Sequence, residues 1–143
     1  MNGFLLDTNV VSELRKKERC APKVNAWAGT VPKNQDFLSV LVVGELVRGA
    51  NLKRRTDPQM ADALARWIGR LTHLYADRIL PITLEIAQEW GRLSALRPIP
   101  PEDGLLAATA LVHRLTLVTR NVRNVEGLGV SLLNPWSWNR SHK

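Results

Sequence analysis

The stretch that decides the fold is Phe4-Leu5-Leu6-Asp7-Thr8-Asn9-Val10-Val11, near the start of the sequence. Three apolar residues are followed by three polar side chains and then by a second apolar segment. A short apolar run with polar borders is typical of a buried strand, and Asp, Thr and Asn favour the start of a helix because their side chains accept hydrogen bonds from backbone N–H groups. We therefore expect a strand at Phe4–Leu6 and a helix that begins near Val10 and continues to Lys17.

The same step from strand to helix recurs along the whole chain. The apolar runs predict further strands at residues 37–39, 79–82, 116–118 and 130–133, and the helical periods predict helices through 45–54, 58–75, 86–96 and 104–114. This alternation is typical of an α/β fold in which helices flank a largely parallel sheet. Pro81 interrupts the third expected strand and places it at an edge of the sheet, because proline donates no ladder hydrogen bond.

Length and composition limit the classes of protein that are possible. The 143 residues, 45% of them hydrophobic and 23% charged, suit one globular domain over residues 1–143 rather than a disordered or multidomain chain. No apolar run approaches the length of a membrane span, and residues 1–4 do not resemble an export signal. Cys20 is the single cysteine, which excludes an intrachain disulfide and a cysteine-rich zinc site. We expect a cytoplasmic protein.

The charge balance favours a polyanionic partner. Twenty Lys and Arg against thirteen Asp and Glu give a net charge of +7, which attracts phosphate groups through Coulomb forces and counterion release. The excess is spread along the chain, with short basic clusters at residues 15–17 and 53–55. Such clusters also occur as solvated helix ends, so the charge indicates a class of partner without locating its binding surface.

Polar side chains stand at the ends of the predicted elements: Asp7, Glu45, Asp103, Asn121 and Asn124. In parallel α/β sheets, the loops after the strands converge at one edge, where ligands bind. Carboxylates gathered at that edge repel one another, and a divalent cation with a preference for oxygen ligands, Mg²⁺ or Mn²⁺, would offset the repulsion. Such an ion can activate water and stabilise a leaving oxygen, so phosphodiester hydrolysis is the reaction that this pattern suggests.

Each of these residues also has a purely structural explanation. Asp7 could cap its helix, Glu45 could pair with Arg48 one helical turn away, and Asp103 could favour the positive end of its helix, with Glu102 as a substitute in its role. The two asparagines could simply form turns. Walker A and GxGxxG motifs are absent from the sequence, and the three histidines have no metal-ligand spacing.

Taken together, the motifs resemble those of the PIN-domain ribonucleases, specifically the VapC and FitB-like toxins of bacterial toxin-antitoxin pairs. The matching stretches are residues 4–13, Leu38-Ser39-Val40, Gly44-Glu45-Leu46-Val47-Arg48-Gly49, residues 103–110, Leu117-Val118-Thr119-Arg120-Asn121, residues 126–130 and Leu133-Asn134-Pro135-Trp136. Their order and spacing, which cover nearly the whole chain, are far more specific than any one of them.

The resemblance implies a PIN-like α/β/α sandwich with a central parallel sheet between helices. It implies that Asp7, Glu45 and Asp103 are the catalytic, metal-binding carboxylates, with Asn9, Thr119, Asn121 and Asn124 as supporting polar residues. Proteins of this family cut RNA with Mg²⁺ or Mn²⁺, are inhibited by a small cognate antitoxin and commonly form homodimers. Because the chain has no helix-turn-helix signature, we expect it to contact DNA only indirectly, through the antitoxin.

The sequence departs from the family pattern at two positions. Asn124 stands where an Asp is frequent, which predicts weaker occupancy of a second metal position, and Val42 replaces a frequent Thr before the Glu45 helix, which leaves Ser39 as the nearest capping hydroxyl. Two alternatives stay open. One is a catalytically decayed module that binds RNA or antitoxin. The other is a phosphatase of the haloacid-dehalogenase type, although Asn9 stands where that family has a second Asp.

Overall fold

The structure is a computed structural model that describes residues 3–140. Within that range the strands are β1 (Phe4–Leu6), β2 (Asp36–Ser39), β3 (Ile79–Leu80), β4 (Thr116–Val118) and β5 (Leu132–Leu133). The α-helices are α1 (Thr8–Leu14), α2 (Pro22–Ala28), α3 (Val40–Lys53), α4 (Pro58–Leu74), α5 (Leu84–Ser94) and α6 (Pro101–His113). Short 3-10 turns follow at η1 (Lys17–Arg19), η2 (Val122–Asn124) and η3 (Pro135–Ser137).

The five strands form one parallel sheet in the order β3-β2-β1-β4-β5. β1 lies at the centre, where Leu5 pairs with Phe37 on one side and with Leu117 on the other. β3 is an edge strand and ends at Leu80, directly before Pro81, as the proline predicted. The expected α/β fold with a parallel sheet is confirmed.

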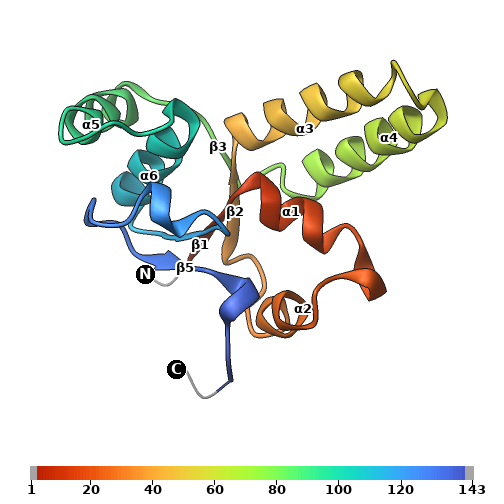
Figure 1. Cartoon of the computed structure of the whole chain (residues 1–143), viewed down its shortest axis with the longest axis horizontal. Coiled ribbons are helices and arrows are strands. Elements are labelled where there is room, and N and C mark those ends of the chain that lie inside the picture. Colours follow the sequence, from red (N-terminus) through yellow and green to blue (C-terminus); the bar gives the residue numbers. More distant parts are fainter. Residues whose placement is uncertain (1–2, 141–143) are drawn as a thin grey trace.

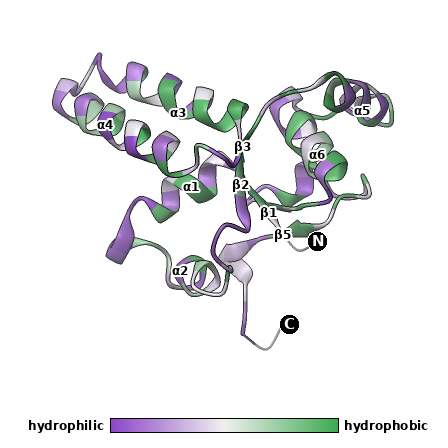
Figure 2. Ribbon diagram, turned by 180° about the vertical axis from the view of Figure 1, so that it is seen from behind, coloured by the Kyte–Doolittle hydropathy of each residue, from purple (hydrophilic) through white to green (hydrophobic). Residues whose placement is uncertain are grey.

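Helices cover both faces of this sheet, which gives three layers (Figure 1). α5 and α6 pack together on one side, and α1 to α4 lie on the other, where α3 and α4 project as an antiparallel pair. In Figure 2 the central strands and much of α6 are hydrophobic, whereas the segment after α1 is hydrophilic. The strand residues Leu5, Leu38 and Val118 are fully buried, so the sheet is the centre of the core. Within residues 3–140 no helix combines the length and the apolar character needed to cross a bilayer.

Several boundaries differ from the sequence prediction for physical reasons. α6 begins at Pro101 rather than at residue 104, because proline suits the first position of a helix, and this places Asp103 inside the first turn. α3 begins directly after β2, with the Ser39 hydroxyl accepting from the backbone N–H of Leu41 at 3.0 Å. Ser39 therefore supplies the cap that Val42 cannot. The last strand covers only Leu132–Leu133, shorter than the expected 130–133.

Helix α2 was not predicted. It has seven residues, begins at Pro22 and buries Val24 and Trp27. It packs against Phe4 and against the η3 turn near the end of the chain. The rings of Phe4 and Trp27 meet edge-on, with their centres 5.5 Å apart. A helix this short is stabilised by such distant contacts rather than by its own sequence pattern.

Candidate functional site

The candidate site lies at the edge of the sheet where the strands end. Because the sheet is parallel, the C-terminal ends of β1, β2 and β4 meet at one edge, and the helices that follow β1 and β2 begin there (Figure 1). Asp7 follows β1 directly, Thr119 follows β4 directly, and Ser39 at the end of β2 is followed by the helix that carries Glu45. The sequence prediction of convergence at this edge is confirmed for these residues.

Asp7 is buried and held by hydrogen bonds from two sides. Its side chain is 7% exposed. Its Oδ1 accepts from the backbone N–H of Thr8 at 2.7 Å, and its Oδ2 accepts from the Thr119 hydroxyl at 2.7 Å. Asp7 thus does cap α1, as its structural explanation predicted, and it also presents a fixed carboxylate at the strand end. Burial raises the pKa of Asp7, the two hydrogen bonds lower it, and the nearby Asp103 raises it.

Glu45 is tied to α1 by a contact that the sequence analysis did not foresee. The Thr8 hydroxyl donates to Glu45 Oε1 at 2.5 Å. The structural alternative, an ion pair with Arg48, is not found: the ion pairs of the described residues do not include one between these two side chains. Burial raises the pKa of Glu45, and the carboxylates of Asp7, Glu102 and Asp103 raise it further against the lowering effect of Thr8.

Asp103 lies in the first turn of α6, where Asn124 donates from Nδ2 to Asp103 Oδ2 at 2.9 Å. Arg97 fixes the loop that carries Asn124, because its guanidinium donates to the backbone oxygens of Asn124 and Glu126. Gly104 lets α6 approach α5 closely, since a Cβ at this position would meet the ring of Trp90 at 3.0 Å. The acid and its amide partner are therefore both held in place by packing and hydrogen bonds.

A pocket of about 770 Å³ opens beside these carboxylates. Thr8, Glu45, Arg48 and Glu102 contribute to its wall, and Gly44 leaves its α3 side open because no atom lies within 4 Å of the place where its Cβ would be. Glu102, the substitute considered for Asp103, thus lines the same pocket as Glu45. Arg48 brings a positive charge to the same wall, which suits a phosphate-bearing ligand.

The supporting residues divide into two groups. Thr119 and Asn124 contact the carboxylates, as described above. Asn9 and Asn121 make no hydrogen bond to them in the described residues: Asn9 Oδ1 accepts from the backbone N–H of Arg120 at 3.4 Å, and the backbone N–H of Asn121 donates to Thr119. Nothing in the sequence pattern indicated that Thr8 belongs to the site. Its hydroxyl reaches Glu45 only because the fold places the start of α1 beside α3.

The arrangement brings carboxylates close to one another, since those of Asp7 and Asp103, in addition to burial, raise the pKa of Glu45. Within residues 3–140, no three His, Cys, Asp or Glu side chains stand close enough to form a ready-made metal site. Burial and the neighbouring carboxylates raise the pKa of Asp7 and of Glu45, because both disfavour the ionised form of these side chains. The donors are all oxygen atoms, the type that Mg²⁺ and Mn²⁺ prefer, so the residues fit such an ion in chemistry.

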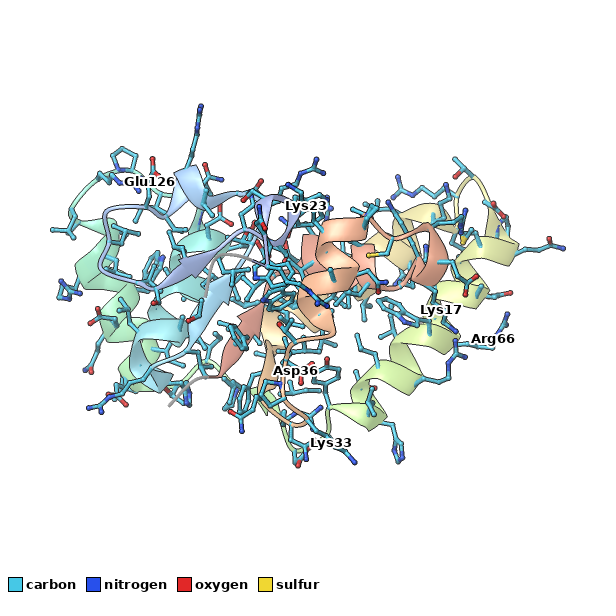
Figure 3. The ribbon with its side chains drawn as sticks, turned by 90° about the horizontal axis from the view of Figure 1, so that it is seen from below. Lys17, Lys23, Lys33, Asp36, Arg66 and Glu126 are labelled. Atoms are coloured by element: carbon cyan, nitrogen blue, oxygen red, sulfur yellow. The ribbon has the colours of Figure 1, made fainter. Side chains whose placement is uncertain are left out.

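Charged side chains also lie outside the candidate site. Lys17 of η1 and Arg66 of α4 lie at one end of the molecule and Glu126 at the other (Figure 3). Asp36, at the opposite edge of the sheet from the candidate site, accepts a hydrogen bond from Tyr75 and contacts Arg78. These contacts of the single Asp36 carboxylate join β2 to the end of α4 and to the residues that follow it.

The comparisons with known proteins agree over nearly the full length. The PIN domain family profile matches residues 4–125. VapC ribonuclease Y4jK of Sinorhizobium fredii is 34% identical over 142 residues, covering 93% of this chain and 97% of that protein. Toxin FitB of Neisseria gonorrhoeae is 32% identical over 141 residues, covering 93% and 98%. The crystal structure of FitAcB from Neisseria gonorrhoeae has a TM-score of 0.84 at 30% identity, covering 94% of this chain and 99% of that one. The chain belongs to the PIN domain family.

Proposed function

We propose that this protein is a metal-dependent endoribonuclease that hydrolyses RNA phosphodiester bonds and acts as the toxin of a toxin-antitoxin pair. The observation that carries the proposal is the convergence of Asp7, Glu45 and Asp103 at one sheet edge of a PIN domain. Relatives that cover nearly the whole chain are named as a ribonuclease and as a toxin. The net charge of +7 supports a nucleic-acid substrate.

Asp7, Glu45 and Asp103 would hold the divalent cation, Mg²⁺ or Mn²⁺. When bound, such an ion lowers the pKa of water and neutralises charge that develops on phosphate oxygens. The chain's own residues prepare the ligands: the Thr119 hydroxyl orients Asp7, the Thr8 hydroxyl orients Glu45, and the Asn124 amide orients Asp103. Against the raising effect of burial, the hydrogen bonds from Thr119 and Thr8 lower the pKa of Asp7 and of Glu45 respectively, and so favour the ionised form that binds a cation.

The expected protein partners are a small cognate antitoxin, which inhibits the nuclease, and a second copy of the chain in a homodimer. The similar solved structures support the antitoxin, since one is the FitAcB complex and another is FitAB bound to a DNA fragment (TM-score 0.85, 28% identity). DNA contact would be indirect, through the antitoxin. A cytoplasmic location, where cellular RNA is available, fits the single cysteine.

The alternative is a PIN-fold module that binds RNA or antitoxin without cutting. Asn124 favours it, because a neutral amide stands beside Asp103 where a further carboxylate would strengthen cation binding. The three remaining carboxylates favour the enzyme, since their mutual repulsion is a cost that a module without a cation has no reason to retain.

Asp7→Asn separates the two functions. We expect this variant to lose metal-dependent cleavage of a cellular RNA pool while it still binds RNA in EDTA, because the substitution removes a charge from the cation site and leaves the basic surface unchanged. Wild-type protein that binds RNA but cuts none with Mg²⁺ or Mn²⁺ would establish the module instead. Cleavage that persists unchanged in Asp7→Asn would indicate a contaminating nuclease.

A further inference from the structure

We propose that Arg120 contacts an RNA phosphate beside the candidate site and that Trp136 holds its guanidinium in position. The proposal rests on the proposed function and deepens it, because it names a residue that positions the substrate. Three independent features carry it: the place of Arg120 in the fold, its stacking on Trp136 and the absence of an acidic partner within the described residues.

Arg120 stands directly beside the acidic cluster. It follows Thr119, whose hydroxyl donates to Asp7, and precedes Asn121, whose backbone N–H donates to the same hydroxyl. The backbone N–H of Thr119 donates to the backbone oxygen of Leu133 at 3.0 Å, which fixes this part of the chain to β5. The backbone N–H of Arg120 points to Asn9 on α1. Arg120 is therefore anchored on the α1 side of the site.

The guanidinium of Arg120 lies over the indole ring of Trp136, 4.8 Å from the ring centre. The ring itself is fixed, because Trp136 belongs to η3, which Asn134 caps with a 2.9 Å hydrogen bond and which packs against α2. Stacking uses the face of a guanidinium and leaves the N–H groups along its edges available, a geometry that suits bidentate contact with phosphate. The stacked arginine is thus pre-positioned, which reduces the entropy cost of binding.

The charge of Arg120 has no carboxylate at ion-pair distance among the residues that the structure describes. The hydrogen bond from Ala21 contributes most to the lowered pKa of Glu13, and the charge of Arg120 contributes least. The Glu13 carboxylate accepts hydrogen bonds from the backbone N–H of Ala21 and from the Lys16 ammonium. Arg92, by contrast, is paired with Glu89. An exposed arginine that is held by a ring yet lacks an acidic partner, next to a proposed phosphodiesterase site, fits the backbone of a single RNA strand.

The test compares two arginines at opposite ends of one strand. Arg120 follows β4 and Arg114 precedes it; both are exposed, and neither forms an ion pair in the described residues. Arg120→Ala and Arg114→Ala each remove one positive charge, but only the first removes it beside the site. Binding of a short fluorescein-labelled single-stranded RNA is measured by anisotropy in EDTA over a range of salt concentrations, so that the readout does not require cleavage.

We expect Arg120→Ala to weaken RNA binding about tenfold, the equivalent of one charge-assisted hydrogen bond. The plot of log affinity against log salt concentration should become less steep by about 0.7, the contribution of one phosphate contact on a single strand. Trp136→Leu should weaken binding about threefold without changing that slope, because the charge stays and only its positioning is lost. Arg114→Ala should match wild type in both quantities.

Cleavage in Mn²⁺, measured on the same variants, distinguishes failure of this inference from failure of the proposed function. Wild-type protein that cuts RNA, together with Arg120→Ala that binds and cuts like Arg114→Ala, would overturn the phosphate contact alone. Weakened binding in Arg120→Ala without cleavage by wild type would support the contact and overturn the nuclease. If Trp136→Leu unfolds at the assay temperature, Arg120→Lys replaces it, since lysine keeps the charge and loses the planar stack.

Discussion

Thr119→Val should destabilise the protein through the two hydrogen bonds that its hydroxyl makes. Thr119 is 2% exposed, donates to Asp7 Oδ2 at 2.7 Å and accepts from the backbone N–H of Asn121 at 3.0 Å. Valine has nearly the same shape, so the core packing is kept and the polar contacts are removed. A hydrogen bond to a charged group contributes about 1.5–3 kcal/mol and a neutral one about 1 kcal/mol, which gives a loss of about 2.5–4 kcal/mol at pH 7.

The size of this loss should depend on pH. The Thr119 hydrogen bond lowers the pKa of Asp7, so its removal raises that pKa further above the ordinary value of 3.8. The native variant then binds a proton more readily than the native wild type does. The destabilisation is therefore largest at neutral pH, where Asp7 is ionised, and shrinks as the pH falls through the pKa of Asp7 toward 3.8.

Urea unfolding followed by tryptophan fluorescence measures both effects, at pH 7 and at several acidic values. Thr119→Ser is the matched control, because it keeps the hydroxyl and loses one buried methyl group, worth about 1 kcal/mol at every pH. A Thr119→Val variant within about 0.5 kcal/mol of wild type at pH 7, a change typical of surface substitutions, would show that these hydrogen bonds do not stabilise the fold. A loss of stability that is the same at all pH values would contradict the role of ionised Asp7.

Three further predictions concern the carboxylates and the packing that supports them. Glu45→Gln should stabilise the metal-free protein at pH 7, because burial and neighbouring acids raise the pKa of Glu45 above 4.5. This gain in stability should vanish as the pH falls toward 4.5. RNA cleavage by the same variant should fall about 100-fold or more. Asn124→Asp should tighten Mn²⁺ binding roughly tenfold in calorimetry and raise cleavage, since it adds a charge beside Asp103. Gly104→Ala should lower stability by about 1 kcal/mol in urea unfolding, because the added Cβ would lie 3.0 Å from the ring of Trp90. Gly69→Ala should raise stability by about 0.5–1 kcal/mol, because no atom lies within 4 Å of the place of its added Cβ.

Each of these predictions has an opposing result. Glu45→Gln that is less stable than wild type at pH 7 would show that the ionised carboxylate stabilises the fold. Asn124→Asp with unchanged Mn²⁺ affinity and unchanged cleavage would remove the link between the amide and cation occupancy. Gly104→Ala as stable as Gly69→Ala would mean that α5 and α6 do not need their close approach.

The parts of the fold that could be predicted from sequence are those with a local pattern. Helix α4 carries apolar residues at helical spacing over its whole length, and the apolar residues of β1 and β4 are directly followed by the polar residues Asp7 and Thr119. Helix α2 lacks such a pattern because its seven residues are held by Phe4 and by η3, which lie far away in the sequence. Its existence depends on contacts that only the assembled fold supplies.

The candidate site shows the same division. Asp7 and Asp103 stand at strand and helix boundaries that the sequence marks, so their convergence at one edge follows from parallel topology. The Thr8–Glu45 hydrogen bond joins residues 37 positions apart and depends on side-chain direction, which residue spacing does not reveal. For the same reason Asn9, a predicted supporting residue, is found to accept from the backbone of Arg120 instead of contacting a carboxylate.

The central claim is that the carboxylates at the sheet edge hold a divalent cation that enables RNA cleavage. The most direct test is cleavage of a cellular RNA pool by purified, antitoxin-free protein in Mg²⁺, in Mn²⁺ and in EDTA, with Asp103→Asn assayed in parallel. We expect cutting by wild type that stops in EDTA, resumes when Mn²⁺ is added in excess and is lost in Asp103→Asn. Cutting that continues in EDTA, or that Asp103→Asn retains in full, would contradict the central claim.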